Sequence, residues 1–131
     1  MKTLFKPGDS KKFAREVTNR DFAEFNGQVL HKVYSTFSLA RDFEWSSRLF
    51  FLEMKEEDEE GVGTFVHIDH RSPAFEGECV EFTAMVESIK KNELICSIEA
   101  RVGDRLVAVA RTGQKMLKKE KLQQLFTKPA I

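Results

Sequence analysis

The stretch Ser35–Met54, STFSLARDFEWSSRLFFLEM, decides the fold of this 131-residue chain. Ser35-Thr36 offers a helix N-cap, because a hydroxyl there accepts hydrogen bonds from the free amides of the first turn. Phe37 to Met54 then runs without Gly or Pro, and its apolar residues are too many for a narrow surface stripe. We therefore predict one long helix that is covered around most of its circumference.

Strand-like segments with alternating apolar and polar residues follow this helix. They are predicted at Gly63–Arg71, Glu78–Lys90, Leu94–Val102 and Arg105–Leu117, the last two joined by a tight turn at Gly103-Asp104. The acidic run Glu56–Glu60 before them is expected to be a solvated loop. A helix lying in the concave face of a strongly curved antiparallel sheet satisfies this order, which is an α+β architecture. The open edges of such a sheet favour dimerisation through edge strands.

The residues before the long helix are expected to add a strand and a short helix. Lys12 to Thr18 is typical of a strand, and Thr18 can then begin a helix that Asn26-Gly27 ends. The buried side of that helix would consist of Phe22, Ala23 and Phe25. We predict a single domain over 1–131, with a polar leader at 1–10 and a C-terminal tail at 118–131 that contains a short helix.

Composition narrows the classes of function. The chain has 21 basic and 21 acidic residues, so its charge gives no reason to expect nucleic acid binding. Its 3 histidines and 2 cysteines lack metal-ligand spacing, so we expect no metal site and two buried, reduced thiols, Cys79 and Cys96. No segment approaches the ~18 apolar residues that span a bilayer, and we expect a soluble, cytoplasmic protein without membrane contact.

Three side chains around the long helix could carry the groups that acyl transfer uses: the Thr36 hydroxyl, the Glu44 carboxylate and the imidazole of either His67 or His70. The two histidines are three residues apart on a predicted strand and so lie on opposite faces, and at most one of them can reach a given pocket. Each also has a plainer structural interpretation. Thr36 can be an ordinary N-cap, Glu44 can form an ion pair with Arg41 or Arg48, and a strand histidine is often structural. A carboxylate buried in so apolar a helix would be costly unless it is paired or takes part in a reaction, which makes Glu44 the stronger of the three indications.

The chain resembles the hotdog-fold acyl-CoA thioesterases from about Leu30 to Phe126, and within them the fluoroacetyl-CoA thioesterase-like family. The matching motifs are Tyr34-Ser35-Thr36, Glu44-Trp45 beginning eight residues after Thr36, Gly61-Val62-Gly63-Thr64, and His70 followed by Ser72-Pro73-Ala74 and Gly77. Two features depart from the family pattern: Arg111–Gln114 stands where related members often have a histidine, and no apolar lid is recognisable around Gly27 and Leu30. The missing lid does not support a fluorinated substrate.

The resemblance implies a hotdog fold, a long central helix wrapped by a curved antiparallel sheet, in a homodimer or a dimer of dimers. It implies an acyl-CoA substrate, with coenzyme A present as part of that substrate and no separate cofactor. The implied catalytic residues are Thr36, Glu44 and His70. The implied substrate-binding residues are Gly63, Thr64 and Phe37.

The resemblance leaves several points open. Glu44 would serve as the general base towards water or as the nucleophile on the thioester, while Thr36 and His70 position groups and relay protons. Lys118, Lys119 and Lys121 could contact the coenzyme A phosphates or belong to a solvated tail. The main alternative to an acyl-CoA thioesterase is a non-catalytic hotdog module that binds acyl-CoA or a similar ligand. A hotdog hydratase is a further alternative, although the Asp/His pair it would use is not found.

Overall fold

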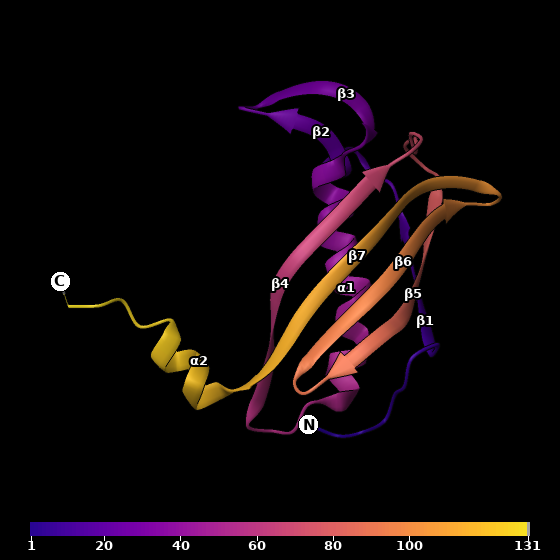
Figure 1. The fold of residues 1–131 in the computed structure, drawn as a ribbon. Helices are drawn as coiled ribbons and strands as arrows, with labels where there is room; N and C mark the ends of the chain where they lie inside the picture. Colours follow the sequence, from indigo (N-terminus) through magenta and orange to yellow (C-terminus); the bar gives the residue numbers. More distant parts are fainter. Residues whose placement is uncertain (131) are drawn as a thin grey trace.

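The long helix, α1, spans Thr36–Met54 and lies along one face of a five-stranded sheet in the computed structural model, which describes residues 1–130 (Figure 1). The other elements, in chain order, are β1 (Ser10–Glu16), the short 3-10 helix η1 (Asn19–Asp21), β2 (Phe22–Phe25), β3 (Gln28–Tyr34), β4 (Glu59–His70), β5 (Cys79–Lys90), β6 (Glu93–Val102), β7 (Arg105–Lys118) and α2 (Lys119–Leu125). No helix in the described part of the chain is both long and apolar enough to cross a membrane.

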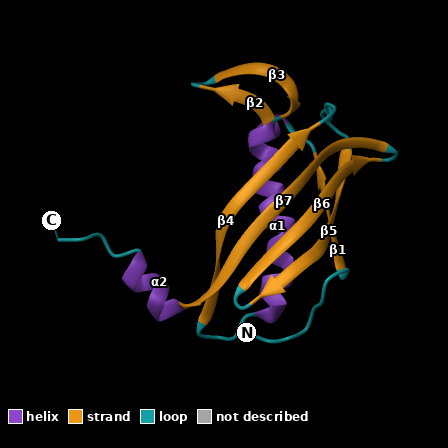
Figure 2. Cartoon of the chain, viewed as in Figure 1, coloured by secondary structure: helices purple, strands orange, loops and turns teal. Residues whose placement is uncertain are grey.

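The sheet has the strand order β1-β5-β6-β7-β4, and every neighbouring pair is antiparallel. The four strands predicted after the helix are confirmed, and Val102 pairs with Arg105 across the predicted tight turn. β4 and β1 are the edges of this sheet, so each offers one row of backbone groups without a strand partner among residues 1–130. Figure 2 shows α1 behind the sheet and the β2–β3 hairpin beyond one end of β4.

The start and the apolar face of α1 follow from its sequence. The Ser35 hydroxyl accepts a hydrogen bond of 2.9 Å from the Ser38 amide, so Ser35 is the N-cap and Thr36 is the first helical residue. The residues that face the sheet are almost completely buried: Leu39, Phe43, Phe50, Phe51 and Met54. Each such side chain contributes about 1.5–3 kcal/mol through burial.

The opposite side of α1 does not match the prediction of a helix covered around most of its circumference. Phe37 is 81% exposed, and Trp45 and Leu52 are also exposed. The sheet of a single chain covers only one side of the helix, which explains the difference (Figure 2). The prediction of two buried cysteines is wrong for Cys79, which is exposed, and confirmed for Cys96, which is buried. Burial raises the pKa of the Cys96 thiol to about 12.

The predicted short helix over Thr18–Phe25 is wrong beyond its first turn. Thr18 and Asp21 form a capping box around η1, and the chain then extends into β2. Asn26 and Gly27 both have positive φ, 54° and 78°, which is the conformation of a two-residue hairpin turn between β2 and β3. Phe25, which was expected on a buried side, is 60% exposed.

The acidic run is also more than a solvated loop, because its last residues begin β4. Glu59 is buried, and Glu60 accepts hydrogen bonds from Arg48 at 2.7 Å and Lys55 at 3.0 Å. The bond from the Gly61 amide, together with Arg48 and Lys55, lowers the pKa of Glu60 from 4.5 to about 2. These bonds fix the end of α1 against the start of β4.

Candidate active site

Thr36 and His70 are brought together at one end of the helix. The Thr36 Oγ1 and His70 Nδ1 atoms lie 2.9 Å apart, within hydrogen-bond distance. Thr36 begins α1 and His70 ends β4. The fold therefore brings into contact two residues that are 34 positions apart in the sequence. The interpretation of Thr36 as the N-cap is wrong, because Ser35 fills that role and leaves the Thr36 hydroxyl free for the imidazole.

The second ring nitrogen of His70 has no partner. Its Nε2 atom is buried and makes no hydrogen bond within residues 1–130. A buried polar atom in this state costs free energy unless another molecule satisfies it. His67 lies on the other face of β4, among the residues of a hollow on the outer side of the sheet, as the alternation of strand side chains predicted. Of these two histidines, His70 is therefore the one that contacts Thr36.

Glu44 is exposed in the single chain, which contradicts the expectation of a buried carboxylate. The predicted ion pairs with Arg41 and Arg48 are also wrong: Arg41 pairs with Asp21 and Asp42, and Arg48 with Glu60. The Glu44 carboxylate instead lies over Gly63, where an added Cβ would be only 2.6 Å from Oε1. Gly63 thus provides room for a close approach, and the approaching group is the Glu44 side chain.

A hollow of about 300 Å³ surrounds this carboxylate. It is lined by Arg41, Glu44, Trp45, Arg48, Gly63 and Gln114. The Gln114 amide donates hydrogen bonds to the Ser47 hydroxyl at 2.6 Å and to the Glu44 backbone oxygen at 3.3 Å, which holds β7 against this part of the helix. Sequence reasoning did not single out Gln114 as a site residue, although it belongs to the segment that departs from the family pattern.

The three predicted catalytic side chains do not converge within one chain. Thr36 and Glu44 are eight residues apart on α1, or about 12 Å along the axis at 1.5 Å per residue. Gly63 and His70 are seven residues apart on β4, or about 23 Å at 3.3 Å per residue. The chain therefore carries two separate groups, which we call the Thr36 half-site (Thr36 and His70) and the Glu44 half-site (Glu44, Gly63 and the hollow).

The other two predicted substrate-binding residues lie in different places. Phe37 directly follows Thr36, and its ring is 81% exposed beside the Thr36 half-site. Thr64 does not line the hollow at Glu44; its hydroxyl lies close above Gly113 of β7, where an added Cβ would be 2.8 Å away. Of the two, Phe37 has the better position for contacting a bound molecule.

A buried polar cluster that sequence reasoning missed lies next to Thr36. Asp42 is completely buried, receives a hydrogen bond from the Tyr34 hydroxyl, and is paired with Arg15 at 2.9 Å and Arg41 at 2.9 Å. Burial and the bond to Asp42 raise the pKa of Tyr34. We call Tyr34, Asp42, Arg15 and Arg41 the Asp42 cluster. It joins β1, β3 and α1, and it therefore fixes the backbone from which Thr36 extends.

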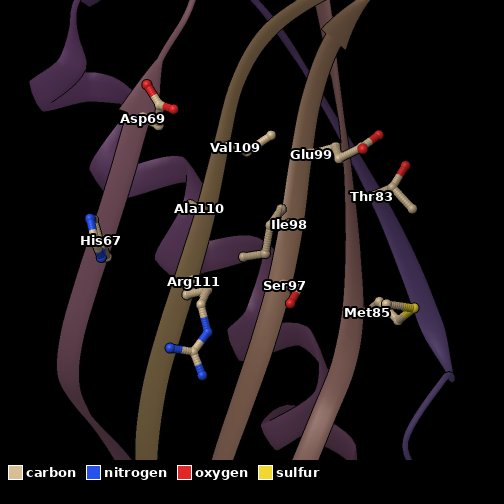
Figure 3. Close-up of a pocket in the computed structure, with 10 residues that line it drawn as sticks. All are labelled: His67, Asp69, Thr83, Met85, Ser97, Ile98, Glu99, Val109, Ala110 and Arg111. Atoms are coloured by element: carbon tan, nitrogen blue, oxygen red, sulfur yellow. The ribbon is translucent and has the colours of Figure 1, made fainter.

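A larger hollow, of about 680 Å³, lies on the face of the sheet away from α1 (Figure 3). It is lined by His67, Asp69, Thr83, Met85, Ser97, Ile98, Glu99, Val109, Ala110 and Arg111. Arg111 is already paired with Glu87 at 2.8 Å, and neither half-site contributes to this surface. Among residues 1–130, no three His, Cys, Asp or Glu side chains are grouped as a metal would need.

The family model for fluoroacetyl-CoA-specific thioesterases matches residues 17–120. A thioesterase superfamily member from Thermus thermophilus is 30% identical, with a TM-score of 0.90 over 95% of this chain and 92% of that one. The fluoroacetyl-CoA thioesterase FlK is 16% identical, with a TM-score of 0.86 over 95% of this chain and 99% of that one. A hot-dog-like protein from Thermanaerovibrio acidaminovorans is 18% identical, with a TM-score of 0.83 over 95% and 96%. No curated protein matches this chain. The hotdog fold predicted from the sequence is confirmed.

Proposed function

The chain belongs to the fluoroacetyl-CoA-specific thioesterase family, and on this premise we propose that it is an enzyme that hydrolyses the thioester bond of an acyl-CoA. The observation that carries the proposal is the Thr36–His70 contact of 2.9 Å at the start of the helix that also bears the unpaired Glu44 carboxylate. A hydroxyl, an imidazole and a free carboxylate are the groups that acyl transfer to water requires.

We propose that two copies of the chain join antiparallel through the free edge of β4. A two-fold axis near the middle of β4 places Gly63 of one copy close to the His70 end of β4 in the other copy. The Glu44 half-site of one copy then faces the Thr36 half-site of its partner, and a dimer has two complete sites. The exposed Phe37, Trp45 and Leu52 side chains and the unsatisfied His70 Nε2 support such a partner.

Hydrolysis in this site would follow one of two routes. Glu44 takes a proton from water, whose oxygen attacks the thioester carbonyl, or its carboxylate attacks the carbonyl directly and water then cleaves the anhydride. In both routes the C–S bond breaks and His70 gives the leaving sulfur a proton, which a proton from the consumed water then replaces. The acyl carbon gains the oxygen of water directly in the first route, and in the second when water attacks the acyl carbon of the anhydride. The amides at the start of α1 stabilise the oxyanion, and the Thr36 hydroxyl is placed to bond to the carbonyl or the attacking water.

Coenzyme A as the thiol part is supported by solved relatives. One variant of the fluoroacetyl-CoA-specific thioesterase has been solved with fluoroacetate and CoA, and another with acetyl-CoA. We therefore propose acyl-CoA as the substrate class of this chain. No other cofactor enters the reaction, because hydrolysis of a thioester consumes only water.

Release of free thiol from a panel of acyl-CoAs, followed with a thiol reagent, tests the proposal. Hydrolysis by the natural chain is expected, and it should be lost in Glu44→Ala. Glu53→Gln is the matched control, because Glu53 lies on the same helix but pairs with Lys11 outside both half-sites. Binding of acyl-CoA without turnover across the panel would overturn the proposal in favour of a non-catalytic module.

A further inference from the structure

The chain ends in a short helical arm that leaves the body of the molecule. We call α2 together with Phe126 the arm; it follows β7 and extends past the free edge of β4 (Figure 1). Leu122 is buried at its base, whereas Leu125 is 60% exposed and Phe126 is 71% exposed. The outer part of the arm therefore presents a leucine and a phenylalanine that nothing in the described chain covers.

A second exposed apolar surface lies on the β2–β3 hairpin. Phe25 is 60% exposed, Leu30 is 55% exposed and Val29 is 47% exposed. The hairpin lies beyond the His70 end of β4, whereas the arm begins at the Glu59 end, where Lys118 pairs with Glu59 (Figure 1). We call Phe25, Val29 and Leu30 the hairpin patch.

Both elements are too small to be stable without further packing. A helix of 7 residues is well below the ~12–15 residues at which isolated helices become marginal in water. A hairpin of two strands is likewise at best marginally stable alone. The arm and the hairpin patch of one chain cannot cover each other, because β4 with its 12 residues separates their bases by about 40 Å.

We propose that the arm of one copy docks on the hairpin patch of a second copy. The inference rests on the proposed antiparallel pairing through β4, which reverses the ends of the strand in the partner. The Glu59 end of one β4 then adjoins the His70 end of the other, so the arm, which already extends past this edge, meets the partner's hairpin. Each contact occurs twice in the dimer because the interface is symmetric.

The docked arm also completes the surroundings of the partner's active site. The hairpin leads through Tyr34 directly into Ser35 and Thr36, and Phe37 beside them is exposed. An arm seated on the hairpin patch covers the open side of the Thr36 half-site with Leu125 and Phe126. It brings Lys119 and Lys121, both exposed, to the rim of the same site. The substrate would therefore meet residues from the arm of one subunit and the helix start of the other.

Chemical cross-linking of two differently tagged chains tests the docking directly. Both chains carry Cys79→Ser to remove the exposed thiol, one carries Phe126→Cys, and the other carries Leu30→Cys. A short bis-maleimide should link the two tags in the mixed sample. Leu4→Cys in place of Phe126→Cys is the control, because Leu4 is similarly exposed, at 55%, but lies outside the arm. If the Leu4→Cys control cross-links as well as Phe126→Cys does, the inference is overturned. It is also overturned if cross-links form only between two chains that carry the same tag.

The dissociation constant of the dimer gives a second, independent measurement. Leu125→Ala combined with Phe126→Ala should raise it about 100-fold, because two apolar side chains per arm lose their burial. Leu4→Ala should change it less than about twofold by the same reasoning. An unchanged dissociation constant of the dimer in the double variant would overturn the arm contact. Binding of the arm to lipid vesicles, without any effect on the dimer, would be one such result.

The two proposals fail in distinguishable ways. A dimer that hydrolyses acyl-CoA but shows neither the cross-link nor the shift in dissociation constant would disprove the arm docking alone. A dimer with the cross-link but no hydrolysis would disprove the enzymatic proposal and retain the docking. A chain that is monomeric at the concentrations of the assay would contradict both.

Discussion

Asp42 and Glu44 are two acids on one helix, two residues apart, and they are in opposite situations. Asp42 is completely buried, accepts hydrogen bonds from Tyr34 and Arg41, and forms an ion pair with Arg15. Glu44 is exposed, and its carboxylate makes no hydrogen bond or ion pair within residues 1–130. The acid whose oxygens are all engaged stabilises the fold, while the acid without partners is available for chemistry.

Helix geometry explains why the difference is so large. Two residues correspond to about 200° around an α-helix, so the two side chains point to nearly opposite sides. Asp42 points towards β1 and β3, and its charge is compensated by Arg15 of β1 and by Arg41 of its own helix, whereas Glu44 points towards the open edge at Gly63. A carboxylate buried without partners would be costly, and the Asp42 cluster avoids that cost.

The largest effect is expected from Glu44→Gln. This change keeps the size of the side chain but removes the base or nucleophile, so kcat/KM should fall about 1,000-fold or more. The free energy of unfolding should not change, since the carboxylate has no partner to lose. Steady-state kinetics and urea unfolding of the same sample measure both quantities. Retained activity would assign the chemistry to another group.

Asp42→Asn should have the converse effect, on stability. Removing the charge leaves Arg41 and Arg15 without their buried partner, which is expected to cost about 3 kcal/mol of unfolding free energy. Urea unfolding measures this loss, and Glu53→Gln provides the comparison with an exposed acid of the same helix. If Asp42→Asn unfolds like the natural chain, the Asp42 cluster does not stabilise this end of the helix.

Neighbouring hydroxyls at the start of α1 offer a smaller version of the same contrast. Thr36→Ala should lower kcat/KM about 100-fold with little loss of stability, because it removes the partner of His70. Ser35→Ala should instead lower the unfolding free energy by about 1 kcal/mol, because it removes the N-cap. Thr36→Ser, which keeps the hydroxyl, should restore most of the activity. Equal kinetic losses in Ser35→Ala and Thr36→Ala would end the distinction between cap and catalytic group.

The smallest effect concerns Glu60, an acid that is paired but only half-buried. Its pKa in the folded chain is about 2 instead of 4.5, so its contribution is present above pH 4.5 and is lost as the pH falls towards 2. Solvent screening limits this contribution to about 1 kcal/mol. Urea unfolding at pH 5 and pH 3 should show a smaller difference in Glu60→Gln than in the natural chain. Glu57→Gln, at an exposed position, should keep the natural difference.

The elements that the sequence predicted correctly are those with long, regular patterns. The absence of Gly and Pro from Phe37 to Met54 gave α1, and alternation gave β5, β6 and β7 within a few residues. Asn26-Gly27 was misinterpreted because the same dipeptide can end a helix or turn a hairpin, and both uses require positive φ. Only the conformation of the residues on both sides distinguishes them.

The site was predicted less completely than the fold. The Thr36–His70 contact agrees with the predicted grouping of these two residues. The predicted burial of the Glu44 side chain was wrong, because residues that are neighbours in the sequence point to different sides of a helix. The Asp42 cluster was missed because its members come from three elements, and no local pattern connects Tyr34 or Arg15 with the helix.

The separation of Thr36 from Glu44 along α1 has a consequence for mixtures of chains. If each site combines one half from each subunit, a chain lacking Glu44 and a chain lacking Thr36 damage different halves. A pair made from one of each keeps one site with both residues intact and one site with neither. Equal amounts of Glu44→Gln and Thr36→Ala, allowed to exchange subunits, should therefore regain about a quarter of the natural activity, since half of the pairs are mixed. Genetic complementation between two inactive alleles would follow from the same geometry.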